Sequence, residues 1–234
     1  KELVAKLDGG RMVGGAGPRF LPDGDVLRSF GQTIQRWRVE PGSKPTTLAK
    51  ASDAIVSMVA SPNGERVAVC TWRNRIELFD VASGKQVGES VELPVRAMSM
   101  TISPDNKFLA VADRAGSLRL YYLAELSPFA TWKVSDDELK TVVFSSNGKW
   151  IAVAGVDGLV RIRTSPGGEP VATLPGHEGG VWSLSFSPDG KKLVTTSRKV
   201  VQFWDVARIP NIRKADLVEI AHQSSVNGSG FGVC

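Results

Sequence analysis

The chain has 234 residues, of which 42% are hydrophobic and 23% are charged, the composition of an ordinary soluble globular protein. Its 29 basic and 24 acidic residues are scattered along the whole length and give a net charge of +5, so neither a nucleic-acid-binding nor a membrane-binding surface is indicated. The two cysteines, Cys70 and Cys234, supply neither a disulfide framework nor metal-ligand spacing, and no apolar run approaches the roughly 20 residues of a membrane helix.

The first predicted elements lie near Lys1. Residues 1–7, KELVAKL, match the outer strand of a repeating unit whose other strands are missing. Residues 9–19, GGRMVGGAGPR, are rich in glycine, but they lack the Gly-Lys-Ser/Thr ending of a phosphate-binding loop and no helix follows them. We therefore expect residues 9–19 to form the inner strand of the first unit, where crowding favours small side chains.

Five similar turns follow in chain order, and each separates two stretches of alternating apolar residues. Pro sets the backbone of the second turn position, while Asp, Asn and Gly tolerate the conformations that come next. The turns are LPDGD at Asp23, SPNGE at Asn63, SPDNK at Asp105, SSNGK at Asn147 and SPDGK at Asp189, at intervals of 40, 42, 42 and 42 residues. Alternation on both sides of each turn predicts β-hairpins.

A second marker keeps the same period. It consists of Trp37, Phe79, Tyr121, Arg163 and Trp204, at intervals of 42, 42, 42 and 41 residues. Each unit divides into four short strands, as in EPVATLP, GVWSLSFS, KKLVTTS and KVVQFWDV of residues 168–206. A four-stranded antiparallel sheet repeated at this period predicts an all-β fold, a β-propeller whose blades bury each other's faces.

Three motifs carry a family resemblance: GHEGGVWSLSFSPDG ending at Gly190, FWDV at 203–206 and LFDV at 78–81. They resemble the WD-repeat (tryptophan-aspartate repeat) β-propellers, and the regular units with short turns resemble bacterial arrays of this family. In the family a Gly-His pair precedes the inner strand and Trp-Asp closes the third strand. Gly176-His177 and Trp204-Asp205 hold these positions here, so the resemblance implies a structural role for His177.

The chain also departs from the family pattern. Blades of the family are often locked by a hydrogen-bonded set of His, Ser or Thr, Asp and Trp, and no unit here keeps all four. The turn aspartate is replaced near Arg198 in the fifth unit, Arg163 replaces the Trp of the unit that has Asp157, and Ala51 stands at the His position of the second. We expect packing to hold most blades together, with reduced rigidity of single blades.

His222, Val226 and Phe231 reproduce the spacing of His177, Val181 and Phe186 near the other end of the sequence. The expected organisation is therefore one domain, 1–234, truncated at both ends, with five complete blades and one orphan strand on each side. The predicted blades span about 11–50, 51–92, 93–134, 135–175 and 177–221. This pattern fits a fragment of a larger propeller, and we expect seven blades in the whole.

Enzymatic constellations are scarce in the sequence. Two histidines, no Gly-x-Ser-x-Gly elbow and no close Cys-His pair favour neither a nucleophile-base pair nor a zinc site. The acidic run at 136–138 is interpreted as a solvated loop, with a cation at the channel mouth as the alternative. We therefore predict no catalytic residue, no metal site and no cofactor.

What remains is the surface formed by the loops, which is where rigid scaffolds commonly carry recognition residues. Interface hot spots favour Trp, Tyr and Arg. The residues predicted to lie at loop ends on the partner-binding rim are Trp72, Arg73, Arg75, Arg114, Asp157, Trp182, Arg198 and Lys199. Trp72 and Trp182 have inter-blade packing as their alternative, and Trp37, Phe79, Tyr121 and Trp204 are expected in the core.

The leading hypothesis is a non-catalytic platform that binds proteins or peptides, as the family resemblance implies, with the regulatory or sensor array of a larger multidomain protein as a close variant. The alternative is a propeller enzyme, a hydrolase or lyase, acting at the axial channel. We expect no nucleic-acid partner, no membrane, a monomeric propeller in the full-length protein and a cytoplasmic location.

Overall fold

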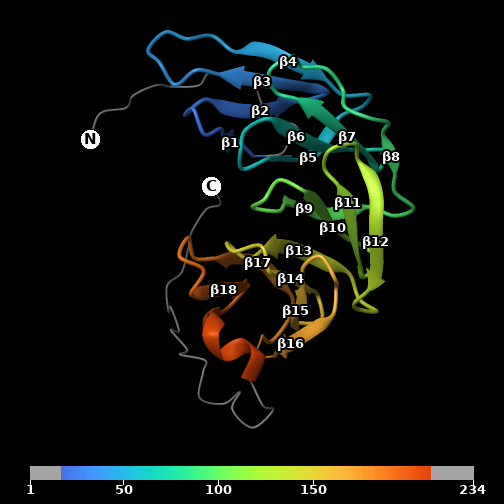
Figure 1. Ribbon diagram of the computed structural model, residues 1–234, viewed down its shortest axis with the longest axis vertical. Coiled ribbons are helices and arrows are strands. Elements are labelled where there is room, and N and C mark those ends of the chain that lie inside the picture. The colour runs from blue at the N-terminus through green and yellow to red at the C-terminus, as the bar shows by residue number, and fades with distance from the viewer. Residues whose placement is uncertain (1–16, 176, 212–234) are drawn as a thin grey trace.

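The computed structural model describes residues 17–175 and 177–211, and over these residues the chain is all-β, as predicted (Figure 1). Four sheets are four-stranded antiparallel meanders, and the fifth has three strands within the described residues. The single helical element among the described residues is a 3-10 turn, η1 (Val206–Asn211), which the sequence patterns do not predict. The strand predicted at 1–7, most of the glycine-rich segment and the motif at 222–231 lie outside the described residues.

We call the five sheets blades 1 to 5 in chain order. Blade 1 contains β1 (Arg19–Phe20), β2 (Val26–Phe30), β3 (Thr33–Trp37) and β4 (Thr46–Lys50). Blade 2 contains β5 (Ile55–Ala60), β6 (Arg66–Thr71), β7 (Arg75–Asp80) and β8 (Val91–Glu92). Blade 3 contains β9 (Ala97–Ile102), β10 (Phe108–Asp113), β11 (Ser117–Tyr122) and β12 (Ser127–Lys133). Blade 4 contains β13 (Leu139–Phe144), β14 (Trp150–Gly155), β15 (Val160–Thr164) and β16 (Pro170–Leu174), and blade 5 contains β17 (Val181–Phe186), β18 (Lys192–Ser197) and β19 (Val201–Asp205).

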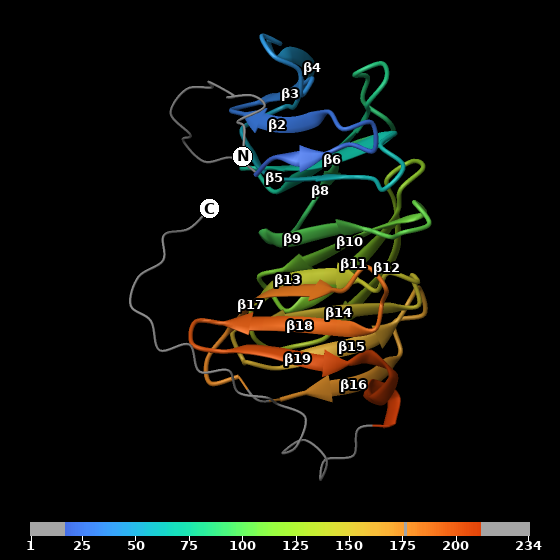
Figure 2. The same ribbon diagram turned by 90° about the vertical axis from the view of Figure 1, so that its left-hand side faces the viewer.

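The blades follow one another along an arc, with the first strand of each blade on the inner side and the fourth on the outer side (Figures 1 and 2). The apolar core is divided into four clusters, and each cluster lies between two neighbouring blades. Between blades 1 and 2, for example, Leu27 and Ile34 pack with Val67 and Val69, all fully buried. A single blade would leave these faces in water, so contact between blades supplies most of the hydrophobic stabilisation.

The five predicted turns connect the first and second strands of each blade, and four of them share one hydrogen-bond pattern. Ser61 Oγ donates to Asn63 Oδ1 across 2.7 Å and accepts the backbone N–H of Arg66 at 2.9 Å. The same pattern recurs at Ser103, Ser145 and Ser187. The serine before each turn therefore fixes both sides of the hairpin, which explains the Ser-x-Asp/Asn repeat.

In blade 5 three of the family's four locking residues are connected. His177 Nε2 lies 2.7 Å from Thr195 Oγ1, and the indole N–H of Trp204 donates to the same oxygen across 3.0 Å. All three side chains are buried. His177 Nδ1 is buried and has no hydrogen-bond partner among the described residues. This is the consequence expected where Arg198 replaces the turn aspartate.

Blades 2, 3 and 4 contain other buried polar links. Glu77 accepts the backbone N–H and the hydroxyl of Ser52. The fully buried Asp113 pairs with Arg119 at 2.9 Å. The carboxylate of Asp157 pairs with Arg161 at 2.6 Å and accepts the Ser135 hydroxyl at 3.0 Å. Different residue pairs therefore anchor the third strand in these three blades, to a loop in blades 2 and 4 and to the end of the second strand in blade 3.

Candidate functional site

The upper rim is the end of the blades at which the second and third strands are joined. One residue at the start of each such connection follows the 42-residue period: Phe30 is the last residue of β2, and the first residues of the other four connections are Trp72, Arg114, Val156 and Arg198. All five side chains are exposed; Trp72 is 68% exposed and Phe30 48%. Large aromatic side chains that remain in water on a rigid frame are typical of interaction sites.

Backbone hydrogen bonds hold the upper-rim turns in place. The N–H of Trp72 donates to Ala54 O at 2.8 Å, that of Arg114 to Arg96 O at 2.9 Å, and that of Val156 to Glu138 O at 3.0 Å. Each acceptor is the residue just before the inner strand of the same blade. The exposed side chains therefore project from fixed backbone, which lowers the entropy that a binding event would lose.

The inner strands of blades 2 to 5 each contain a β-bulge near their upper-rim end. In blade 5 Val181 pairs with Ser197 and Ser183 with Thr196, so Trp182 has no partner in the ladder. The equivalent bulged residues are Val56, Met98 and Lys140, again 42 residues apart. A bulge reorients one side chain at the end of a strand. The side chains of the bulged residues therefore form a second periodic set, at the upper-rim ends of the inner strands.

Cations from neighbouring blades lie over the two exposed tryptophans. Arg96 of blade 3 stands 5.8 Å from the ring of Trp72 in blade 2, and Lys140 of blade 4 stands 5.2 Å from the ring of Trp182 in blade 5. Such contacts contribute roughly 0.5–1 kcal/mol at exposed sites. Each pair combines an apolar surface with a positive charge and bridges two blades.

Several charged residues of the upper rim are paired with one another. Arg73 lies 3.4 Å from Asp53, and Lys140 lies 2.9 Å from Glu138 of the acidic run 136–138. Burial opposes ionisation of Asp157, but hydrogen bonds from Arg161, the Leu159 N–H and Ser135 outweigh it and lower the pKa of this carboxyl below its usual value. Asp157 therefore stays a carboxylate held in an internal pair.

The structure places all eight predicted rim residues at the upper rim. Trp72, Arg73, Arg114, Asp157, Arg198 and Lys199 lie in the connections between second and third strands, while Arg75 and Trp182 lie at strand starts. Asp157 is half-buried and paired, so it is the least available of them. Whether these residues bind a partner stays a prediction. The core positions Trp37, Phe79, Tyr121 and Trp204 are buried, and Asp205 is half-buried near Lys192.

Sequence reasoning missed Phe30, Arg96 and Lys140 at this rim. Phe30 lies 42 residues before Trp72, so a comparison of equivalent positions would have found it. Lys140 lies 42 residues before Trp182 in the same way. Arg96 is brought over Trp72 by contact between blades, for which the sequence offers no local signal.

Within residues 17–175 and 177–211, no group of three or more His, Cys, Asp and Glu side chains is arranged to hold a metal ion. No helix in the described part of the chain is long and apolar enough to span a membrane.

Comparison with known proteins identifies the repeats. The model of the WD domain, G-beta repeat (WD40) matches residues 127–163 and 168–205, two consecutive units. These two units are WD repeats, so the chain carries repeats of the WD-repeat β-propeller family. This WD-repeat chain is 32% identical over 111 residues to the uncharacterized WD repeat-containing protein sll1491 of Synechocystis, an alignment of 47% of this chain and 32% of the relative. It is 26% identical over 171 residues to WD repeat-containing protein AAC3 of Dictyostelium discoideum, covering 70% of this chain and 36% of the relative.

Telomerase protein component 1 of Rattus norvegicus is 30% identical over 202 residues, covering 82% of this WD-repeat chain and 8% of the relative. The chain thus spans about a third or less of these curated relatives. Among solved structures, a chain of the crystal structure of the mitotic checkpoint complex superposes with a TM-score of 0.70 at 17% identity, over 89% of this chain and 73% of that one. This similarity supports the propeller fold.

Proposed function

We propose that this WD-repeat chain is a non-catalytic platform that binds protein or peptide partners at its upper rim. The observation that carries the proposal is the pair of exposed tryptophans, Trp72 and Trp182, each under a cation from the adjacent blade. Trp and Arg dominate the binding energy of protein interfaces, because they combine large apolar area with hydrogen-bonding or charged groups.

The WD repeats support the same proposal, since WD-repeat propellers generally mediate protein–protein interactions. A regulatory or sensor array within a larger multidomain protein, monomeric as a propeller, is the finer form of the proposal. It is supported by relatives of which this chain matches only a part. The cytoplasmic location remains a prediction.

The test is a pull-down with the double variant Trp72→Ser, Trp182→Ser. Both side chains are more than half exposed, so the variant is expected to keep its fold and to lose at least about tenfold in partner recovery. Phe129→Ser is the matched control, because Phe129 is an exposed aromatic residue on the outer strand β12. Undiminished recovery of all partners by the double variant would contradict the proposed site.

A further inference from the structure

A second concave surface lies on the lower rim, the end of the blades that carries the Ser-x-Asp/Asn turns. Two cavities of about 500 and 510 Å³ lie between blades 1 and 2 at this end. Both are lined by Arg36, Val81 and Ala82. Because they share these three residues, the two cavities lie next to each other, and together they are here called the lower groove.

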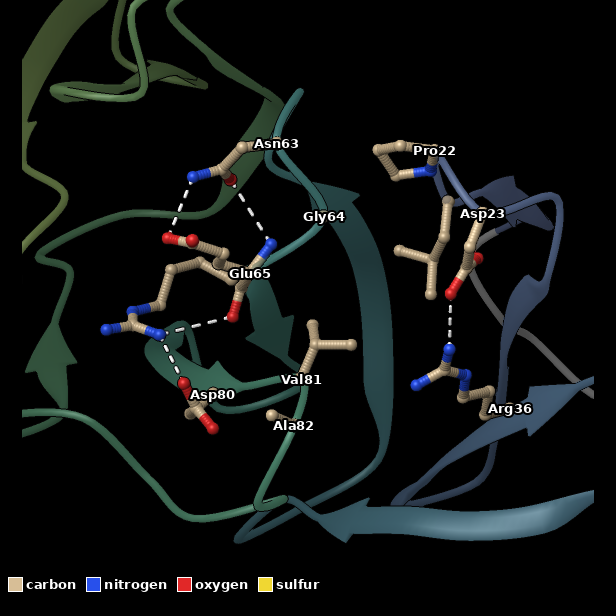
Figure 3. A pocket seen from close by; sticks show the side chains of 11 residues that line it. Pro22, Asp23, Arg36, Asn63, Gly64, Glu65, Asp80, Val81 and Ala82 are labelled. Atoms are coloured by element: carbon tan, nitrogen blue, oxygen red, sulfur yellow. Dashed lines mark hydrogen bonds and ion pairs between the residues drawn. The ribbon is translucent and has the colours of Figure 1, made fainter.

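The first cavity of the lower groove has an apolar centre between two polar walls. Figure 3 shows Asp23 and Arg36 on the blade 1 side, Asn63 and Asp80 on the blade 2 side, and Val81 between them. Arg36 pairs with Asp23 and with Asp25, and Arg66 pairs with Asp80. Both arginines of these walls are thus engaged in ion pairs, with the carboxylates Asp23, Asp80 and Glu65 in excess, and the apolar surface of the cavity is formed by Val81 and Ala82.

The second cavity is lined by the connection between β3 and β4 of blade 1. This connection, residues 38–45, is longer than its equivalents at 123–126 in blade 3 and 165–169 in blade 4. The hydroxyl of Ser43 donates to the backbone oxygen of Arg38 and ties the two arms of the connection together. Arg38 and Lys44 therefore line the same cavity, together with the side chains of Thr46, Thr47 and Ser83.

The second cavity is electropositive. Arg36 is engaged by Asp23 and Asp25, whereas Arg38 and Lys44 are exposed and no described carboxylate forms an ion pair with either. Thr46, whose hydroxyl donates to Arg36 O, and the exposed Thr47 also line this cavity. Arg, Lys and hydroxyl donors together are suited to the oxygens of a carboxylate or phosphoryl group. This end of the lower groove is therefore chemically complementary to an oxyanion.

We propose that the lower groove is a second binding site, for an extended peptide segment in which a small apolar side chain is followed by a carboxylate or a phosphoryl group. The apolar side chain packs on Val81 and Ala82, and the oxyanion is held by Arg38 and Lys44. The site lies at the opposite end of the blades from the upper rim, so it is independent of the function proposed above.

Fluorescence anisotropy with three labelled, capped peptides tests this site on the whole chain. The first probe is Gly-Val-Asp-Asp-Gly. The second probe has two phosphoserines in place of the two aspartates, and the third is the uncharged Gly-Val-Asn-Asn-Gly. We expect at least one acidic probe to bind and the uncharged probe to bind at least about tenfold more weakly, with an affinity that falls as salt rises. Equal binding of all three peptides, or none by either acidic peptide, would overturn the proposal. Preference for the phosphoserine or the aspartate probe identifies the oxyanion.

Three variants locate the binding. The double variant Arg38→Ser, Lys44→Ser removes the two unpaired cations from an exposed connection. It is expected to lower the affinity for the acidic probe at least about tenfold. Arg198→Ser with Lys199→Ser removes the same charge from the upper rim and is expected to leave probe binding unchanged. Ala82 lines both cavities, so Ala82→Trp places a bulky side chain in the groove without changing its charge. This variant is expected to block binding of the peptide.

Equal losses in the two charge variants would show non-specific attraction and contradict the site. Inorganic phosphate that competes as tightly as the phosphoserine peptide, with no effect of Ala82→Trp, would show a free-anion site and contradict peptide binding. The Trp72→Ser, Trp182→Ser variant is expected to bind the probe normally, so failure at one rim is distinguishable from failure at the other.

Discussion

The indole N–H of Trp204 donates a hydrogen bond to Thr195 Oγ1 across 3.0 Å, and both side chains are buried. The same oxygen lies 2.7 Å from His177 Nε2, so the threonine joins the third strand of blade 5 to the loop before its inner strand. The hydroxyl oxygen accepts from Trp204, and its contact with His177 Nε2 is a second hydrogen bond whose donor is set by the imidazole tautomer. One hydroxyl therefore satisfies two buried groups.

Thr195→Val keeps the shape of this side chain and removes both hydrogen bonds. Buried nitrogens of His177 and Trp204 are then left unpaired, and we expect a loss of about 2 kcal/mol in the free energy of unfolding. Urea unfolding followed by tryptophan fluorescence measures it. Thr196→Val, one residue along the same strand and only half-buried, is the control, with an expected change within about 0.5 kcal/mol. Equal effects of both substitutions would argue against the linking role of Thr195.

Stability is expected to depend on pH through His177. Burial lowers the pKa of His177 below its ordinary value of 6.5. The unfolded state therefore binds the proton more readily, so the stabilisation is complete above pH 6.5 and decreases as the pH falls below it. Asp157 and Asp189 also have a lowered pKa, but these carboxyls change the stability only below pH 3.8, their ordinary pKa. Their effect is therefore separate from that of His177. Unfolding curves of the wild type and His177→Gln between these two values measure the effect, and identical pH slopes would refute it.

Removing Arg119 is expected to destabilise blade 3. Its partner Asp113 is fully buried and would lose its counter-charge, at a cost of about 3 kcal/mol for Arg119→Met. Arg114→Met, which changes an exposed arginine next to Asp113, is the control and is expected to be nearly neutral. Chemical denaturation of the two variants gives the comparison. The account of this pair fails if Asp113→Ala combined with Arg119→Met is no better tolerated than the sum of the single changes.

Gly42 and Gly158 have similar backbone angles, so substituting each by Ala distinguishes the cost of backbone strain from the cost of a steric clash. Gly158 has φ +75°, and an added Cβ would lie 2.5 Å from the backbone oxygen of His177 in the neighbouring blade. Gly42 has φ +79° with no atom within 4 Å of such a Cβ. We expect Gly42→Ala to cost about 1 kcal/mol and Gly158→Ala about 3 kcal/mol in thermal or urea unfolding. Equal costs would contradict the close approach of blades 4 and 5.

The fold could be predicted from the sequence because short local motifs specify its turns and strands. The turns at Asn63, Asp105, Asn147 and Asp189 are fixed by a serine two residues before each of them, so the period could be read from short motifs. The apolar alternation on both sides then determined which strand faces are buried. All-β architecture and five successive sheets were predicted on these grounds and are confirmed.

The parts that were not predicted depend on contacts between distant residues. The hydrogen bond between Ser52 and Glu77 joins residues 25 positions apart, and no sequence motif predicts it. Arg96 reaches Trp72 only because blades 2 and 3 are adjacent in space. The bulges that reorient Lys140 and Trp182 arise from ladder register, which single-strand patterns do not specify. The lower groove is lined by the connections that follow the third strands of blades 1 and 2, and the turn motifs of the repeat do not describe these connections.

The central claim is that partners dock on the upper rim. Amide hydrogen–deuterium exchange of the chain, with and without a partner recovered in the pull-down, tests it most directly. We predict slower exchange at the turns around Trp72, Arg114 and Arg198 and at the start of the inner strand that carries Trp182. Slower exchange confined to the Ser-x-Asp/Asn turns or the outer strands, with the upper rim unchanged, would contradict the claim.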